Sequence, residues 1–273
     1  MMSWLESILF GLVCGLTEFL PVSAQAHETL LLKVFGASAT PLLRLVIHGT
    51  ALVALYQSCA TYIGQMFQEQ QLIKIPPRRR KRQPDMVKVL DYRLLRTATV
   101  IMSLGFIGYT FLSQWRGDLY FIAPMLAING LILYIPMHLA TGNKDSRTMS
   151  QLDAVLLGLM GAAAVIPGIS AIGLIIAAGI IRGADREHSL NWALLLGIPS
   201  LVIRVGFDVY SIMTDGLGSL SILSIGLAAA AAFGGAYCAI RVMRFLAVKA
   251  GFSCFGYYCW GAALFALLIF LTV

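Results

Sequence analysis

Long apolar stretches, separated by short polar segments, make up most of the chain. A helix needs roughly 20 apolar residues to cross the hydrocarbon core of a bilayer, which is about 30 Å thick. The pattern therefore predicts an all-α integral membrane protein that forms a single membrane domain over residues 1–273. The candidate membrane segments cover residues 4–35, 41–64, 97–115, 119–140, 151–183, 189–212, 217–247 and 251–273.

Two of these segments are interrupted by polar residues and proline. The first, residues 4–35, contains a polar cluster around Pro21, and the fifth, residues 151–183, is interrupted around Pro167. Proline removes a backbone donor, and polar groups at membrane depth are costly unless they line a protein cavity. Each segment would also be too long as one straight span, so we expect two re-entrant pairs of half-helices that each enter and leave on one side.

The two interruptions match each other in spacing. Interrupted segments at corresponding places in two halves indicate an inverted repeat with its site near the bilayer midplane. We expect halves of about 1–140 and 151–273, with about six transmembrane helices in addition to the two re-entrant pairs. The alternative is that glycine and proline are simply frequent in membrane helices. The matched positions are Gly11, Gly15, Pro21 and Ser23 in the first half and Gly158, Gly161, Pro167 and Ser170 in the second.

The composition agrees with a membrane environment. Hydrophobic residues make up 59% of the chain and charged residues 12%, whereas soluble domains carry about 25% charged residues. The start of the chain keeps Glu6 and lacks the basic region of a removable leader, so we expect it to remain in the mature protein. Five cysteines show no metal-ligand spacing and are predicted to be free thiols: Cys14, Cys59, Cys238, Cys254 and Cys259.

The positive charge is concentrated in one part of the chain. Residues 68–96 hold nine basic and three acidic side chains, and they include the run from Arg78 to Arg82. A basic segment beside apolar spans is the usual sign of a cytoplasmic loop, which here would contact anionic lipid headgroups. We therefore expect a basic cytoplasmic loop at 68–96 and no nucleic-acid partner.

Ionisable residues at membrane depth are candidates for function, because burying them costs free energy. Glu18 and His27 flank Pro21 inside apolar sequence. If the chain is helical after Pro21, Ser23 and His27 are spaced i, i+4 and share a face, so the histidine could deprotonate the serine. The same spacing also suits a polar contact that merely stabilises the re-entrant turn.

A nine-residue segment, Gly15–Ser23 (GLTEFLPVS), resembles the signature of the undecaprenyl pyrophosphate phosphatase (BacA/UppP) family. The similarity runs along nearly the whole chain. Ile47–Thr50 resembles the family's HLGT or QLG segment, and Pro167–Ser170 resembles the start of its PGxSRSG motif. Arg186 and Asp208 also fall in register with the family's sequence.

The resemblance implies six transmembrane helices and two re-entrant pairs in inverted repeats. It implies a multi-pass protein of the bacterial inner membrane that removes the terminal phosphate of undecaprenyl pyrophosphate. That reaction recycles the lipid carrier of peptidoglycan synthesis, and overproduction gives bacitracin resistance. A divalent cation, Mg²⁺ or Ca²⁺, is often required in the family, but here Glu18 with Glu28 would be a thin ligand set. The metal is therefore left open, as is a homodimer.

The family's catalytic residues are retained only in part. The resemblance assigns Glu18, Ser23 and His27 as catalytic residues, and it places Thr17 and Ser170 at the substrate. Other positions differ from the family: Cys14 stands in place of the first glutamate, Ala24 in place of the usual serine nucleophile, Gln25-Ala26 in place of Thr-Gly, Ala171 in place of the phosphate-binding arginine, and Ile172 in place of a serine. Losing one electrostatic donor typically slows a reaction by about 10² to 10³, so these changes predict a slow or silent phosphatase.

Arg204 is the candidate to compensate for the arginine lost at Ala171, because it lies in the middle of an apolar stretch. In this hypothesis it binds the substrate's phosphate. The alternative is that Arg204 snorkels or pairs with Asp208 one turn away. The hypothesis places its guanidinium in a cavity bounded by Glu18, Ser23, His27 and Ser170.

Other charged residues within the spans have simpler explanations. Glu28 is expected to pair with Arg44, which takes a position that is often acidic in the family. His48 and His138 are expected to satisfy their hydrogen bonds within their own helices.

Three functions remain open at this point. The first is a phosphatase acting on a polyprenyl pyrophosphate. The second is a transporter or flippase of the lipid carrier, because inverted repeats with broken helices are a transporter architecture. The third is a silent family member that binds polyprenyl phosphate or a partner protein.

Overall fold

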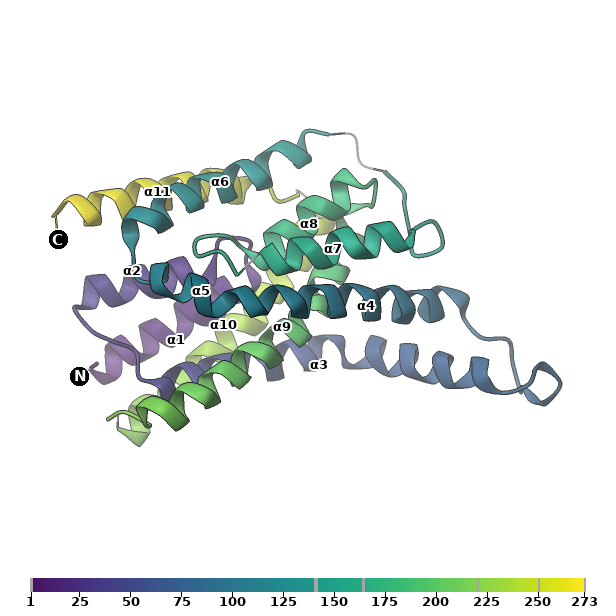
Figure 1. Ribbon diagram of the computed structural model, residues 1–273, viewed down its shortest axis with the longest axis horizontal. Coiled ribbons are helices and arrows are strands. Elements are labelled where there is room, and N and C mark those ends of the chain that lie inside the picture. The colour runs from purple at the N-terminus through teal and green to yellow at the C-terminus, as the bar shows by residue number, and fades with distance from the viewer. Residues whose placement is uncertain (1, 140–141, 164, 220, 250, 273) are drawn as a thin grey trace.

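The computed structural model describes residues 2–139, 142–163, 165–219, 221–249 and 251–272, so the predicted segment ends at 140 and 273 lie outside the described residues. Apart from one isolated bridge between Lys144 and Ala184, the regular structure of these residues is helical. The α-helices are α1 (Trp4–Phe19), α2 (Ala24–Phe35), α3 (Pro41–Lys74), α4 (Met86–Gly105), α5 (Tyr109–Leu112), α6 (Leu119–Met137), α7 (Gln151–Ala163), α8 (Ala171–Ile181), α9 (Arg186–Asp215), α10 (Ile222–Lys249) and α11 (Cys254–Thr272) (Figure 1). Three short 3₁₀ turns occur at Pro77–Arg79, Phe106–Gly108 and Ser113–Trp115.

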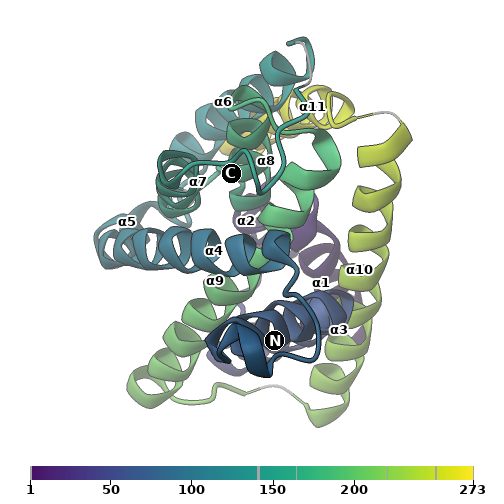
Figure 2. The same cartoon turned by 90° about the vertical axis from the view of Figure 1, so that its right-hand side faces the viewer.

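Five helices of the described chain are long and apolar enough to cross a membrane, namely α3, α6, α9, α10 and α11. This confirms the predicted all-α integral membrane protein. The sixth expected span corresponds to α4. This helix is long enough but less apolar than the other five, because its first half carries Lys88, Asp91 and Arg93. The end-on view shows α6 and α11 side by side at one edge of the molecule (Figure 2).

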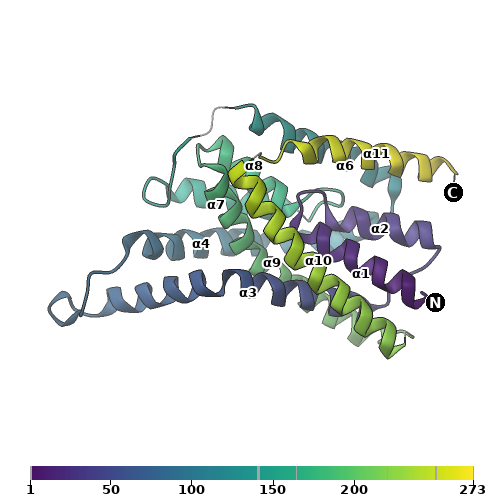
Figure 3. The same cartoon turned by 180° about the vertical axis from the view of Figure 1, so that it is seen from behind.

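The two interrupted segments form helix pairs, as the sequence predicts. α1 and α2 are joined by residues 20–23, and α7 and α8 by a turn that contains Pro167. α1, the longest of the four helices with 16 residues, would span only about 24 Å, so none of them crosses a bilayer alone. The outer ends of α1 and α2 lie at the same end of the molecule as the end of α11, whereas α7 and α8 start and finish toward the opposite end (Figures 1 and 3).

The tips of the two pairs are joined by Asn129 of α6, which is completely buried. Its side-chain Nδ2 donates to the carbonyl oxygen of Pro21 at 2.9 Å, and its Oδ1 accepts from the backbone N–H of Ser170 at 2.9 Å. Both tips therefore meet inside the protein, where a single amide satisfies one backbone group from each.

Small residues let the first helix of each pair pack closely on a long helix. A Cβ at Gly11 or Gly15 of α1 would collide with the backbone of α10. A Cβ at Gly158 of α7 would come within 2.6 Å of the carbonyl oxygen of Ala98 on α4. Such close approach of backbones is the usual way in which membrane helices associate.

The basic loop is shorter than the expected 68–96. α3 continues to Lys74 and α4 begins at Met86, so the connection comprises residues 75–85. Glu69 at the end of α3 binds Arg82 of the loop at 2.5 Å and accepts the backbone N–H of Asp85 at 2.9 Å. The two helices form a hairpin that projects from the rest of the molecule (Figure 1).

Candidate functional site

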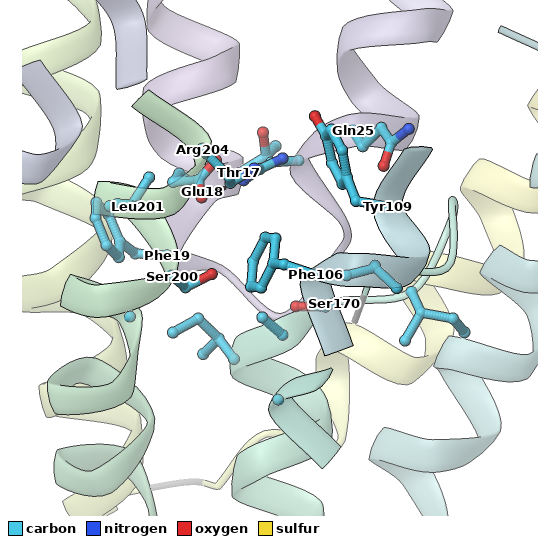
Figure 4. A pocket seen from close by; sticks show the side chains of 17 residues that line it. Thr17, Glu18, Phe19, Gln25, Phe106, Tyr109, Ser170, Ser200, Leu201 and Arg204 are labelled. Carbon is cyan, nitrogen blue, oxygen red and sulfur yellow. Dashed lines mark hydrogen bonds and ion pairs between the residues drawn. The ribbon is translucent and has the colours of Figure 1, made fainter. Parts of the chain in front are cut away.

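A cavity of about 60 Å³ lies between the tips of the two re-entrant pairs. Its wall combines the end of α1, the start of α2, the start of α8 and the middle of α9 (Figure 4). The 3₁₀ turn after α4 closes one side through Phe106. The polar side chains that line the cavity are Thr17, Glu18, Gln25, Tyr109, Ser170, Ser200 and Arg204.

Arg204 lies in this cavity and pairs with Glu18 across 186 positions of sequence. Its Nη1 donates to Glu18 Oε1 at 2.7 Å, and the two side chains are 16% and 12% exposed. Among the described residues only Nη1 of Arg204 has a hydrogen-bond partner, so the guanidinium keeps donors for an anion. The alternative pairing with Asp208 is wrong, because that carboxylate accepts from His48 instead.

Two further charge pairs adjoin the first. Arg44 Nε donates to Glu28 Oε1 at 2.6 Å, which confirms the expected pair. His48 Nδ1 lies 2.6 Å from Asp208 Oδ2 on α9, so the expectation of a local partner for His48 is wrong. The local partner expected for His138 is found, since its Nδ1 contacts the carbonyl oxygen of Tyr134 at 2.8 Å.

Ser23 and His27 lie beside the cavity but do not line it, which corrects the expected cavity wall. Ser23 is the N-cap of α2, with φ 68° and its Oγ accepting from the backbone N–H of Ala26 at 3.4 Å. His27 contacts the carbonyl oxygen of Ser23 through Nδ1 at 2.9 Å and the hydroxyl of Tyr258 through Nε2 at 2.8 Å. Both ring nitrogens thus have partners other than the serine hydroxyl, because the capping geometry turns that hydroxyl toward the helix N-terminus.

Thr17 and Ser170 line the cavity, as a substrate-binding role requires. Thr17 Oγ1 donates to the carbonyl oxygen of Val13 at 2.7 Å. Ser170 is the N-cap of α8 and its Oγ accepts from the backbone N–H of Gly173 at 3.2 Å. Each hydroxyl oxygen retains capacity for a further hydrogen bond.

The residues that depart from the family pattern also lie at the site. Ala24 and Ala171 both line the cavity, and Cys14 lines a smaller neighbouring space that it shares with Glu18 and Arg204. The hydroxyl and guanidinium that these positions lack are therefore absent from the cavity itself.

Several site residues were missed from the sequence. Asn129 could have been found, since it is a lone amide within the apolar segment 119–140. Tyr109 and Ser200 carry no comparable signal, because hydroxyl groups are easily satisfied within a helix.

The carboxylates do not fit a divalent cation. Among the described residues, no group of three or more histidine, cysteine, aspartate or glutamate side chains could hold a metal ion. Glu18 and Glu28, the two candidate ligands, are each paired with an arginine. A cation would have to displace both arginines.

The fold and the cavity define an all-α membrane protein with an arginine and a carboxylate held between two re-entrant tips. The family model described as "Bacitracin resistance protein BacA" matches residues 7–265, and the chain belongs to that family. A protein of Methanobrevibacter smithii named undecaprenyl-diphosphatase is 30% identical over 265 residues, which is 95% of each chain. One of the same name from Micrococcus luteus is 30% identical over 279 residues and 98% of each chain. A third, from Alkaliphilus metalliredigens, is 28% identical over 267 residues, covering 95% of this chain and 96% of the relative.

Proposed function

We propose that the protein binds a polyprenyl diphosphate, with the diphosphate in the cavity between the re-entrant tips, and removes its terminal phosphate. The observation that carries the proposal is the Glu18–Arg204 pair in the cavity wall. The relatives named undecaprenyl-diphosphatase support the substrate class.

In this proposal Arg204 binds the terminal phosphate and Glu18 activates water. The free nitrogens of the guanidinium donate to phosphate oxygens, with Thr17 and Ser170 as further hydrogen-bonding partners. Water attacks the terminal phosphorus while Glu18 takes a proton from it. The bond from that phosphorus to the bridging oxygen breaks, and the bridging oxygen keeps the electron pair. The products are inorganic phosphate and polyprenyl monophosphate.

For Ser23 and His27 we propose a positioning role, which their observed contacts support. His27 ties the carbonyl oxygen of Ser23 to Tyr258 on α11 and so holds the turn that presents Glu18. The catalytic role that the resemblance assigns to this pair remains a prediction, and it would require the serine hydroxyl to leave its capping position.

The second candidate function is binding or transport of a polyprenyl phosphate without hydrolysis. Ala24 and Ala171 favour it, since the cavity lacks the hydroxyl and the guanidinium that the family pattern has there. Losing the guanidinium donor slows catalysis by about 10² to 10³ and losing the nucleophile slows it further, but one remaining arginine is enough to bind an anion.

Phosphate release from a polyprenyl diphosphate by the purified full chain separates the two functions. If the protein is a phosphatase, the wild type should release phosphate, and Glu18→Gln and Arg204→Gln should each abolish this release. The control Arg241→Gln, at an exposed position, should release phosphate at the wild-type rate. Ala171→Arg is expected to increase release by returning the missing donor.

If no phosphate is released but lipid-phosphate binding depends on Arg204, the second function holds. Binding that is unchanged in Arg204→Gln would contradict both.

The cellular setting belongs to the same proposal. Several helices capable of spanning a membrane and the family both indicate a multi-pass membrane protein. We place it in the bacterial inner membrane, where a lipid carrier is recycled. The homodimer also remains a prediction, which chemical cross-linking in native membranes can check.

A further inference from the structure

A second, larger groove with several charged side chains in its lining lies next to the cavity. It has a volume of about 640 Å³ and opens at the end of the molecule where α2 ends and α3 begins. Its walls are α2, residues 36–39, the first turn of α3 and residues 116–117. The groove is therefore on the opposite side of the molecule from the tip of the α3–α4 hairpin (Figure 1).

Positive charge dominates the groove. Lys33, Arg44 and Arg116 line it, and Glu28 is its one carboxylate among the described residues. The Arg44–Glu28 pair uses only Nε of the arginine, and among the described residues the other two nitrogens of Arg44 make no hydrogen bond. The guanidinium of Arg116 lies over the Tyr109 ring, 4.4 Å from its centroid. Arg44 thus presents unpaired N–H groups to the groove, and Arg116 adds a second guanidinium to its lining.

Gln25 connects the groove to the cavity. It lines both spaces, and its Nε2 is buried without a hydrogen-bond partner in the described chain. A buried amide donor that lacks a partner destabilises the protein, and an anion between the two spaces would supply the missing acceptor. The small space beside it is lined by Glu18, Glu28, Arg44 and Arg204, so the ion pairs of cavity and groove adjoin.

We propose that this groove is a second phosphate-binding site, formed by Arg44, Arg116 and Gln25. Its ligand is a phosphate dianion, either a lipid monophosphate headgroup or free inorganic phosphate. Two guanidinium groups suit such a ligand because each can donate two parallel hydrogen bonds to its oxygens. Binding there does not require hydrolysis in the cavity, whereas use of the groove as the exit for released phosphate rests on the proposed function.

Equilibrium dialysis of radiolabelled inorganic phosphate against the full chain in detergent, at low ionic strength, tests the site. The wild type is expected to bind phosphate at two sites, in the cavity and in the groove. Arg116→Gln should weaken the groove site about tenfold or more, since it removes a charge-assisted donor without breaking an ion pair. Arg116→Lys, which keeps the charge, should recover part of that loss.

Two comparisons make the result specific to the groove. Arg204→Gln should remove the cavity site and leave the groove site, so failure of the proposed function is distinguishable from failure of this one. Arg78→Gln, at the opposite end of the molecule, should bind phosphate like the wild type. Identical binding curves for wild type, Arg116→Gln and Gln25→Leu would overturn the proposal.

The source of the phosphate follows from a competition in nanodiscs. If polyprenyl monophosphate in the bilayer displaces labelled phosphate from the groove of Arg204→Gln, the ligand is a lipid headgroup. If the label stays bound, the ligand is free phosphate. In both cases the Arg116→Gln/Arg204→Gln double variant should no longer bind labelled phosphate. If it still binds the label, the groove is not the phosphate-binding site.

Discussion

At the scale of single residues, the buried charges form pairs that join different helices. Glu18 of α1 pairs with Arg204 of α9, and Glu28 of α2 pairs with Arg44 of α3. A charge at this depth is costly alone, so removing one partner leaves an uncompensated charge. The two ion pairs therefore fix the re-entrant helices α1 and α2 against two long helices, and they keep polar groups at the cavity.

Arg204→Gln is expected to lower the free energy of unfolding by about 3 kcal/mol, because it leaves Glu18 buried and unpaired. The double variant Glu18→Gln/Arg204→Gln should be more stable than Arg204→Gln, since no charge then lacks a partner. Thermal unfolding in detergent measures both. Equal or lower stability of the double variant would show that the pair is not what stabilises this site.

Among the uncharged polar residues of the bundle, Asn129 is expected to be the one whose substitution destabilises the protein most. Asn129→Leu leaves the carbonyl of Pro21 and the N–H of Ser170 without their partner and should cost about 1 to 3 kcal/mol for each buried group. Asn191→Leu, on the exposed face of α9, is the matched control and should unfold like the wild type. If both variants unfold alike, the amide does not hold the tips together.

The sequence identified the important charges but not all of their partners. Glu18 and Arg204 stand out as lone charges in apolar stretches, and this signal is local. The alternative pairing of Arg204 with Asp208 rested on helical spacing alone, which compares residues of one helix. In the structure Arg204 instead contacts Glu18, because the end of α1 lies beside the part of α9 that carries Arg204.

At the scale of helices, the two halves repeat the same packing. α1 lies along α10 and α7 along α4, so the first helix of each re-entrant pair packs on a long helix from the other half. Glycines that match in sequence make both contacts, Gly11 and Gly15 in one and Gly158 in the other. We propose on this ground that residues 1–140 and 151–273 are inverted repeats.

Gly15→Ala is expected to destabilise the protein by about 1 to 3 kcal/mol, because the new Cβ would collide with the carbonyl of Ala232 and force α1 away from α10. Gly234→Ala on α10, where nothing lies within 4 Å of the added Cβ, is the control and should be neutral or slightly stabilising. Thermal unfolding of the two variants in one detergent compares them. Equal stability would contradict close packing of α1 on α10.

The positions of the membrane helices could be predicted from the apolar stretches, whereas the ends of the helices that extend beyond the membrane could not. α3 and α4 both continue into residues 68–96, which were expected to be a loop. That segment is rich in glutamine, glutamate, lysine and arginine, which favour helix as strongly as most apolar residues do. Polarity marks where a helix leaves the bilayer, and proline at positions 76, 77 and 84 marks where these helices end.

At the scale of the whole molecule, the hairpin and the groove lie at opposite ends. α3 has 34 residues, or about 51 Å of helix, so it extends well past a hydrocarbon core of about 30 Å. Its far end leads into the run from Arg78 to Arg82, and positive charge of this density predicts a cytoplasmic position for the hairpin tip. We therefore propose that the groove at the other end faces outward, together with the start of α1 and the end of α11 (Figure 1).

Cysteine labelling of intact cells tests this orientation, in a chain whose five native cysteines are replaced. Gln83→Cys, in the hairpin loop, should react with a membrane-impermeant maleimide only after the cells are opened. Ser38→Cys, on the rim of the groove, should react in intact cells and be protected by excess phosphate if the groove binds it. Strong labelling of Gln83→Cys from outside would reverse the orientation, and the groove would then open to the cytoplasm.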